Sequence, residues 1–203
     1  GLAFTEALAR PLTWADWPAE SRKIFRTMRG PDGGAAVLEK NVFVEGLPPA
    51  SVARGLSPEA LDRYRQPFAA PEDRWPTLEW PRQIPIENVP PRVRDVVSRY
   101  GQWLRTSDVP KLFINAEPGS ILVGRPRAFV RKWAALTEVT VPGSHFVPED
   151  SPHEIGRALA GIRVNEHRMR AMGFGTFGYK LAAFTLAGAL AGLAGYLWGA
   201  QTG

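Results

Sequence analysis

Residues 111–141 read KLFINAEPGSILVGRPRAFVRKWAALTEVTV and contain a strand pattern, a helix pattern and a second strand pattern. The runs 111–115 and 138–141 have the short, apolar character of buried strands, whereas 126–135 has the spacing of a helix. A further helix is expected before this stretch, over 91–105. Strands that alternate with helices form parallel sheets, so the sequence predicts an α/β fold.

Polar residues follow each predicted strand at the point where the strand ends. The chain begins with the apolar run GLAF and then Glu6, Glu117 follows the strand at 111–115, and His145 lies in the loop after 138–141. The carboxyl ends of parallel strands meet at one edge of a sheet, where α/β proteins place their chemistry. His145 is therefore a candidate base, and either carboxylate could reach it. The alternative for each of the three is an ordinary polar loop residue without a catalytic role.

The segment 14–85 differs in texture from the rest of the chain. Short helical patterns at 19–28, 35–43 and 57–65 are separated by Pro and Gly and accompanied by four tryptophans. This combination predicts a helical insertion and not additional strands of the sheet.

Composition excludes several classes of site. The 203 residues include no Cys and only three His, which are isolated from one another, so the sequence predicts neither a disulfide nor a metal site nor a cofactor. The formal net charge is +5, of which residues 163–180 contribute +3. Lys and Arg in residues 1–162 are scattered among acidic residues, so nucleic-acid binding is not expected.

The C-terminal tail has membrane-like composition. Residues 181–203 contain no charged residue and no Pro, and the 20 residues from Leu181 to Ala200 would form a helix of about 30 Å, the thickness of a bilayer core. Gly188 and Gly192 have the spacing that lets another helix approach closely. We predict a transmembrane helix here, with the basic segment before it on the cytoplasmic side. An apolar core helix is the alternative.

Six stretches of residues 1–162 carry a family resemblance: GLAFTE (1–6), NVFVEG (41–46), YRQPF (64–68), WPRQIPI (80–86), PKLF (110–113) and GSHFVPED (143–150). Together they resemble the C-terminal half of a haloalkane dehalogenase of the α/β-hydrolase fold. The resemblance implies a cap over about 14–85, on a core formed by 1–13 and 86–162. It also implies that a small halogenated hydrocarbon and water are the substrates.

The same resemblance assigns roles to the polar residues. It implies that His145 is the general base and that Glu6 is the acid that orients it. Some members of the family carry the acid after the later strand, so Glu117 is the alternative. An apolar pocket is expected beneath the cap, with Phe43, Leu47, Leu122 and Phe146 as its predicted lining.

One part of that chemistry is missing from the sequence. A dehalogenase of this kind needs a nucleophilic Asp on a tight strand-to-helix turn with Gly two residues before and after it, as in a nucleophile elbow. None of the seven Asp residues has these neighbours. The family's halide-binding Trp and Asn also belong to the N-terminal half. Because the chain starts without Met and inside a strand pattern, we expect a fragment that is inactive alone.

The tail carries a resemblance of its own, through NEHRMRAMG (165–173), YKLAAF (179–184) and GALAGLAG (188–195). Residues 163–203 resemble part of the membrane-spanning permease subunit of a branched-chain amino acid ABC transporter. Two further interpretations follow. The chain could be a membrane component of such a transporter, or a chimeric fragment without function.

Overall fold

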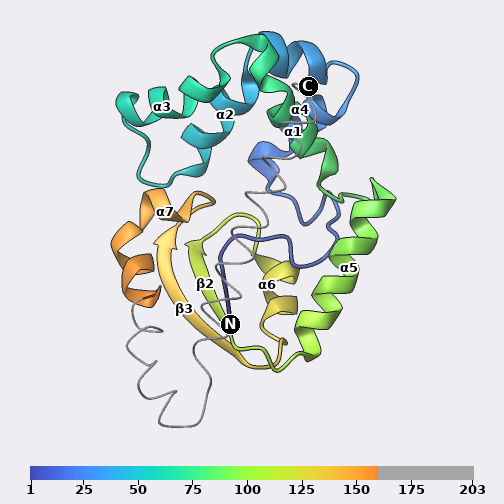
Figure 1. Ribbon diagram of the computed structural model, residues 1–203, viewed down its shortest axis with the longest axis vertical. Coiled ribbons are helices and arrows are strands. Elements are labelled where there is room, and N and C mark those ends of the chain that lie inside the picture. Colours follow the sequence, from blue (N-terminus) through green and yellow to red (C-terminus); the bar gives the residue numbers. More distant parts are fainter. Residues whose placement is uncertain (160–203) are drawn as a thin grey trace, which may run out of the picture.

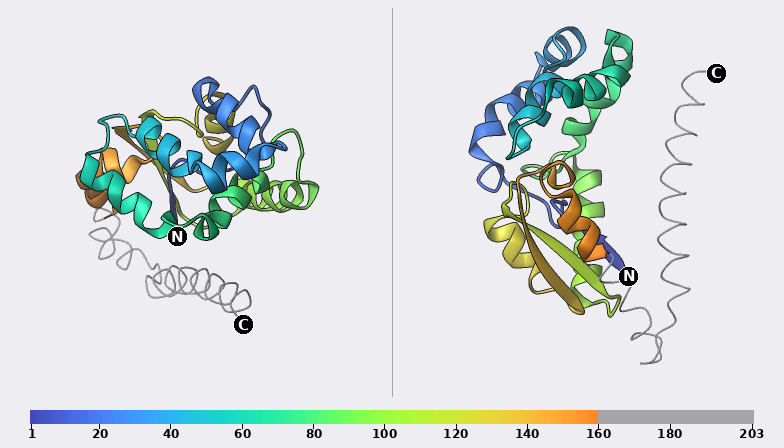
Figure 2. Two further views of the ribbon diagram at one scale, coloured as in Figure 1. Left: turned by 90° about the horizontal axis from the view of Figure 1, so that it is seen from above. Right: turned by 90° about the vertical axis from the view of Figure 1, so that its left-hand side faces the viewer.

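A computed structural model describes residues 1–159, which form an α/β unit and a helical cap above it (Figure 1). The right-hand view of Figure 2 also shows the cap above the α/β unit. Within the described residues, none of the helices has the length and apolar character that a bilayer crossing requires. The transmembrane helix predicted at 181–200 lies outside the described residues.

The sheet has three parallel strands in the order β1 (Leu2–Phe4), β2 (Lys111–Pro118) and β3 (Leu136–Gly143). Phe4 pairs with Phe113 across the first two strands, and the parallel pairing continues from β2 to β3. This confirms the α/β fold with a parallel sheet that the sequence predicted. The arrowheads of β2 and β3 point toward the cap, so their carboxyl ends lie beneath it (Figure 1).

Helices cover both faces of the sheet because successive residues of β2 point to opposite sides. On one face, Phe113 packs with residues of α5 (Pro91–Thr106) and α6 (Gly124–Val130) in a buried cluster. On the other face, Leu112 and Ile114 pack with residues of α7 (Val147–Asp150) and of the helical segment 152–159. A parallel strand that is buried on both faces reads as a continuous apolar run, as β2 does.

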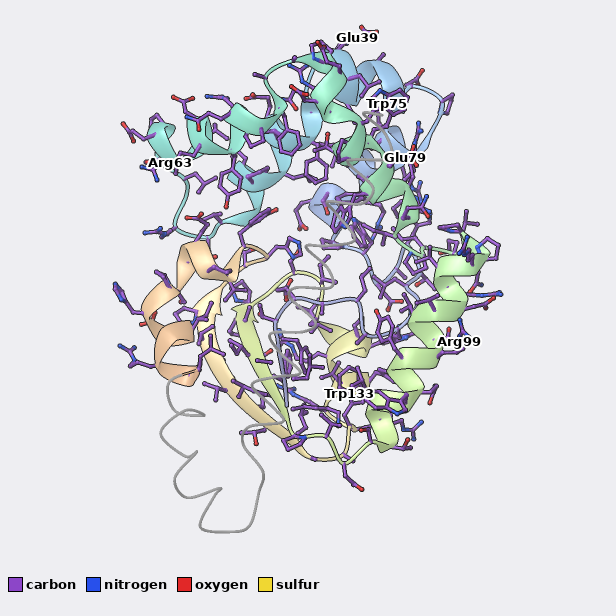
Figure 3. All side chains as sticks on the ribbon, in the orientation of Figure 1. Glu39, Arg63, Trp75, Glu79, Arg99 and Trp133 are labelled. Atoms are coloured by element: carbon purple, nitrogen blue, oxygen red, sulfur yellow. The ribbon has the colours of Figure 1, made fainter. Side chains whose placement is uncertain are left out.

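The cap is a cluster of short helices that packs around its own apolar core. Its helical elements are α1 (Ala19–Arg29), η1 (Ala35–Glu39), α2 (Val42–Ser51), α3 (Pro58–Arg65), η2 (Gln66–Phe68), η3 (Pro71–Arg74) and α4 (Trp75–Gln83). The core contains Trp17, Phe25 and Met28. In Figure 3, Trp75 and Glu79 mark α4 in the cap, whereas Trp133 lies far below in the α/β unit.

Several predicted element boundaries were wrong. The helix expected over 35–43 is divided, because Asn41 adopts a left-handed conformation with φ 52° between η1 and α2. The helix expected to reach 135 ends at Val130, and Ala135 has a positive φ of 50°. Strands β2 and β3 continue past their predicted ends at 115 and 141 because backbone pairing extends as far as Pro118 and Gly143.

Arg29 connects α1 to the last turn of α4 and to the segment that follows it. Its guanidinium donates hydrogen bonds to the backbone carbonyls of Pro81 at 2.6 Å, Ile84 at 2.7 Å and Val89 at 2.9 Å. Arg74 makes a similar set of bonds to the carbonyls of Leu38, Phe68 and Ala69. A guanidinium carries five donors, so one side chain can satisfy carbonyls that irregular backbone leaves unpaired.

Candidate active site

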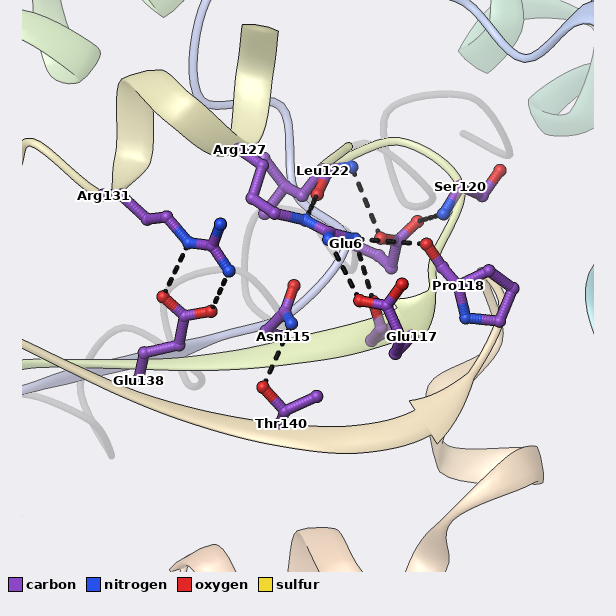
Figure 4. A network of polar contacts seen from close by, with 11 residues as sticks. Glu6, Asn115, Glu117, Pro118, Ser120, Leu122, Arg127, Arg131, Glu138 and Thr140 are labelled. Atoms are coloured by element: carbon purple, nitrogen blue, oxygen red, sulfur yellow. Dashed lines mark hydrogen bonds and ion pairs between the residues drawn. The ribbon is translucent and has the colours of Figure 1, made fainter. Parts of the chain in front are cut away.

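Glu6 lies just past the end of β1, and its carboxylate accepts hydrogen bonds from three successive backbone N–H groups of one loop. Oε2 accepts the N–H groups of Ser120 at 3.1 Å and Ile121 at 2.6 Å, and Oε1 accepts the N–H of Leu122 at 3.3 Å. The Glu6 side chain is only 3% exposed. A buried carboxylate needs such partners because it has lost its hydration. Figure 4 shows the donors of Ser120 and Leu122 directed at it.

Arg127 holds the loop that supplies these donors. Its guanidinium donates to the carbonyls of Leu122 at 2.7 Å, Ala116 at 3.0 Å and Pro118 at 3.1 Å (Figure 4). Gly119 adopts φ +72°, a conformation that other residues rarely adopt. The side chain and the glycine together fix the turn that directs the loop N–H groups toward the carboxylate.

His145 contacts the Glu6 carboxylate through its ring. The Nδ1 atom lies 3.2 Å from Oε2 of Glu6, and the His145 side chain is 30% exposed. A carboxylate only accepts hydrogen bonds, so we assign the proton to Nδ1 in this contact, which leaves Nε2 as the basic nitrogen. The strand ends therefore bring together two of the polar residues singled out from the sequence.

Glu117, the alternative acid, lies elsewhere. Its side chain is 60% exposed, and its Oε2 is 3.1 Å from Nη1 of Arg127. Figure 4 shows the Glu117 carboxylate bonded to the Arg127 guanidinium. The structure thus pairs Glu6 with His145 and pairs Glu117 with Arg127.

A cavity of about 330 Å³ lies between the cap and the carboxyl edge of the sheet. Both Glu6 and His145 line it, as do Phe43, Leu47 and Phe146 of the predicted pocket. The remaining lining residues are mostly apolar: Ala7, Leu8, Trp17, Ser21, Phe25, Ser51, Trp80, Ile84, Ser120 and Ile121. A cavity with apolar walls and a few convergent polar groups is typical of sites for small organic ligands.

The prediction for Leu122 needs correction. Leu122 is 1% exposed and packs with Phe113 and Val130 beside the sheet, not in the cavity. Its backbone N–H donates to Oε1 of Glu6, while its side chain belongs to the buried cluster beside the sheet. The cap residues Trp17 and Phe25 were missed, because helical periodicity shows which face is buried but not what it faces.

An imidazole that is held by a buried carboxylate at the floor of an apolar cavity can remove a proton from water. The carboxylate fixes the tautomer and stabilises the imidazolium that forms. In the described residues there is no cluster of three or more His, Asp or Glu that could hold a metal ion. The contact between His145 and Glu6 supports general base catalysis of hydrolysis.

Comparison with known proteins finds relatives for most of the chain. A haloalkane dehalogenase of Sphingobium indicum is 50% identical over 163 residues, which is 80% of this chain and 55% of that protein. A haloalkane dehalogenase of Mycolicibacterium smegmatis is 47% identical over 165 residues, 80% of this chain and 53% of that protein. The chain thus spans about half the length of the relatives it matches.

Solved structures give the same result. A putative ancestral haloalkane dehalogenase matches with a TM-score of 0.74 and 38% identity, over 79% of this chain and 58% of that one. The haloalkane dehalogenase of Bradyrhizobium elkani matches with a TM-score of 0.73 and 36% identity, over 79% and 57%. The α/β-hydrolase-like fold and the resemblance stated from the sequence are confirmed.

The family model for the branched-chain amino acid transport system permease component matches residues 153–203. The resemblance of the tail to such a permease is therefore also found by comparison. The match begins inside the helical segment 152–159, where Ile155 and Ala158 pack on the cluster that includes Leu112 and Ile114 of β2. The described part of the matched stretch thus belongs to the α/β unit.

Proposed function

We propose that this chain, which is similar to haloalkane dehalogenases over 80% of its length, carries the base and the acid of a hydrolytic dehalogenase site. His145 is the base and Glu6 is the acid that orients it. The observation that carries this proposal is the contact of 3.2 Å between His145 Nδ1 and the buried Glu6 carboxylate on the floor of an apolar cavity. A small halogenated hydrocarbon suits the size and the apolar lining of that cavity.

The reaction consists of two steps. A carboxylate attacks the carbon that bears the halogen, so that a carbon–oxygen bond forms, the carbon–halogen bond breaks and halide leaves. Water then attacks the carbonyl carbon of the resulting ester while Nε2 of His145 takes a proton from it. The imidazolium gives this proton to the departing alkoxide, so the alcohol leaves, and the acid that remains loses its proton to water, which restores the nucleophilic carboxylate. His145 and Glu6 serve the second step only.

The nucleophile for the first step would come from outside these 203 residues. Among the described residues that line the cavity, Glu6 is the one acidic residue. Its carboxylate oxygens already accept hydrogen bonds from the loop N–H groups and contact His145. We therefore propose that the 203-residue chain does not hydrolyse haloalkanes alone. It would need a partner segment that provides a nucleophile and halide-binding donors.

A graft tests this proposal. Residues 1–162 of this chain would replace the matching half of the Sphingobium indicum relative, which keeps its own first half. We expect the graft to release bromide from dibromoethane with multiple turnovers. His145→Ala should reduce turnover by about 10²–10⁴-fold, since general base catalysis contributes that much. The ester should then accumulate, so intact mass spectrometry should show one added alkyl group.

The matched control is Glu117→Gln, which removes the alternative acid. Its carboxylate is paired with Arg127 and away from His145, so turnover should change by less than about threefold. A soluble, folded graft that releases no bromide would overturn the proposal. Strong loss in Glu117→Gln with retention in Glu6→Gln would instead assign the acid to Glu117.

A second candidate function is favoured by the family-model match at 153–203. In this alternative the chain is a component of an amino acid transporter, anchored by residues 181–200, and residues 1–162 remain on the cytoplasmic side. A chimeric fragment without function is the third possibility. Carbonate extraction of membranes distinguishes a membrane component from a soluble product.

A further inference from the structure

The loop that carries His145 is attached to the cap by its backbone. The carbonyl of Ser51, the last residue of α2, accepts the N–H groups of both His145 and Phe146 at 3.1 Å. The imidazole is thus held from two directions. Its backbone is bonded to the cap, while its ring contacts Glu6 in the α/β unit.

Asp150 makes a second connection between the same two segments. Its Oδ2 accepts the N–H of Ser144 at 2.8 Å, directly before His145, and its Oδ1 accepts the N–H of Arg54 at 3.0 Å, just after α2. One carboxylate therefore bridges the cap and the base loop. Gly143 leaves room for it, because a Cβ there would lie 3.2 Å from Oδ2 of Asp150.

The Asp150 carboxylate is suited to remain charged in this place. Burial tends to raise its pKa, but hydrogen bonds from the backbone N–H groups of Ser144, Arg54 and Ala53 outweigh that effect and lower the pKa below its ordinary value. Charge-assisted bonds of this kind are stronger than those between neutral groups.

Contacts of Glu149 reinforce the bridge from the neighbouring position. Its Oε1 accepts a hydrogen bond from the Tyr64 hydroxyl of α3 at 2.9 Å, and its Oε2 lies 3.6 Å from the Arg54 guanidinium. The Tyr64 ring also packs edge-on against Phe146. Two adjacent carboxylates of α7 thus hold the α2–α3 part of the cap.

We propose that Asp150 is a positioning residue, which couples the cap segment 51–54 to the loop of His145 and thereby holds the imidazole against Glu6. The coupling joins the ligand cavity to the base, because Phe43, Leu47 and Ser51 on α2 all line the cavity. Only the consequence for catalysis rests on the proposed function, since the bridge itself is a property of the described residues.

The test compares Asp150→Asn with wild type in the full 203-residue chain. An amide keeps one acceptor oxygen and turns an NH₂ group toward the other N–H, so one side of the bridge is lost. We expect hydrogen exchange at the amides of His145 and Phe146 to accelerate by about 10- to 100-fold. Exchange at Phe113 and Ile114 in β2, measured in the same sample, corrects for any global loss of stability.

Imidazole NMR supplies a readout that a purely structural role would not change. In wild type the Nδ1 proton bonded to Glu6 should give a protected signal, and Asp150→Asn should broaden or remove it. The matched control is Glu154→Gln, which removes a carboxylate of the 152–159 segment that pairs with Arg157. This control should leave both the exchange rates and the imidazole signal unchanged.

Two outcomes would overturn the coupling. One is unchanged exchange at residues 145 and 146 relative to β2, and the other is an unchanged Nδ1 proton signal in Asp150→Asn. In the graft, Asp150→Asn should keep the first burst of about one bromide per site and slow only the later turnovers, because His145 acts in the second step. A wild-type graft without turnover would refute the proposed function and leave the exchange result intact.

Discussion

A single loop supplies the three backbone N–H groups that bond to the Glu6 carboxylate. The N–H groups of residues 120–122 point at its carboxylate because Gly119 turns the chain with φ +72°. A Cβ at Gly119 would lie 2.8 Å from the carbonyl oxygen of Ala116 and 3.2 Å from Oε1 of Glu6. The glycine is thus required both by backbone conformation and by the proximity of the acid.

Replacing that glycine should damage the acid site. We expect Gly119→Ala to destabilise the chain by about 1–3 kcal/mol, because it combines a disfavoured φ with close contacts. Gly34→Ala is the matched control, since a Cβ there meets nothing within 4 Å and its φ is −58°. Urea unfolding followed by circular dichroism measures both. A Gly119→Ala midpoint equal to that of Gly34→Ala would contradict the argument.

The residues of the candidate site were only partly predictable from the sequence. The position of Glu6 and His145 at one edge of the sheet was predictable, because the ends of parallel strands meet there. Strand positions alone did not decide between Glu6 and Glu117, since each follows a predicted strand, and only the family resemblance favoured Glu6. The choice depends on which carboxylate the N–H groups of residues 120–122 face, and on Arg127 engaging Glu117. Such contacts leave no local pattern in the sequence.

Elements differ in how much of them the sequence determines. The long amphipathic helix α5 and the capped helix α3 were predicted nearly as they are, because periodicity and an N-cap serine mark them locally. The predicted helix at 126–135 ends early because tertiary bonding takes over. The N–H of Ala134 bonds to the carbonyl of Arg105, and the N–H of Lys111 bonds to that of Ala135.

The elements of the cap depend on arginine bonds that no periodicity reveals. We expect Arg29→Met to destabilise the chain by about 2–4 kcal/mol, because several partly buried carbonyls lose a charged donor at once. Arg63→Met is the control, since that side chain is exposed on α3 (Figure 3). Thermal unfolding followed by tryptophan fluorescence measures the difference, since four of the tryptophans lie in residues 14–85. Equal melting temperatures for the two variants would refute this role.

At the scale of the whole molecule, the chain joins two resemblances that meet near the helical segment 152–159. Ile155 and Ala158 of that segment pack on the same sheet face as α7. Its packing places it with the α/β unit, although the permease match already includes it from residue 153. We therefore propose that the dehalogenase-like part ends near residue 162.

The composition of the tail predicts how the molecule fractionates. A chain with the uncharged residues 181–203 should stay in membranes through carbonate extraction, whereas a chain ending at residue 162 should be released. Immunoblotting of pellet and supernatant measures the difference. Release of the full-length chain would exclude a transmembrane anchor and the transport interpretation. Retention of the shortened chain would point to another membrane contact.

The backbone hydrogen bonds between Ser51 and residues 145–146 also affect how a ligand can enter and leave the cavity. A cap tied in this way to the base loop is unsuited to swing open as a rigid lid, since opening would displace the imidazole. Trp80 lines the cavity, is 51% exposed and packs edge-on against Phe43. Entry and exit would then follow aromatic rotamer changes in nanoseconds, not hinge motions in milliseconds. Uptake into the cavity would then select narrow molecules by their width, independently of the reaction that follows.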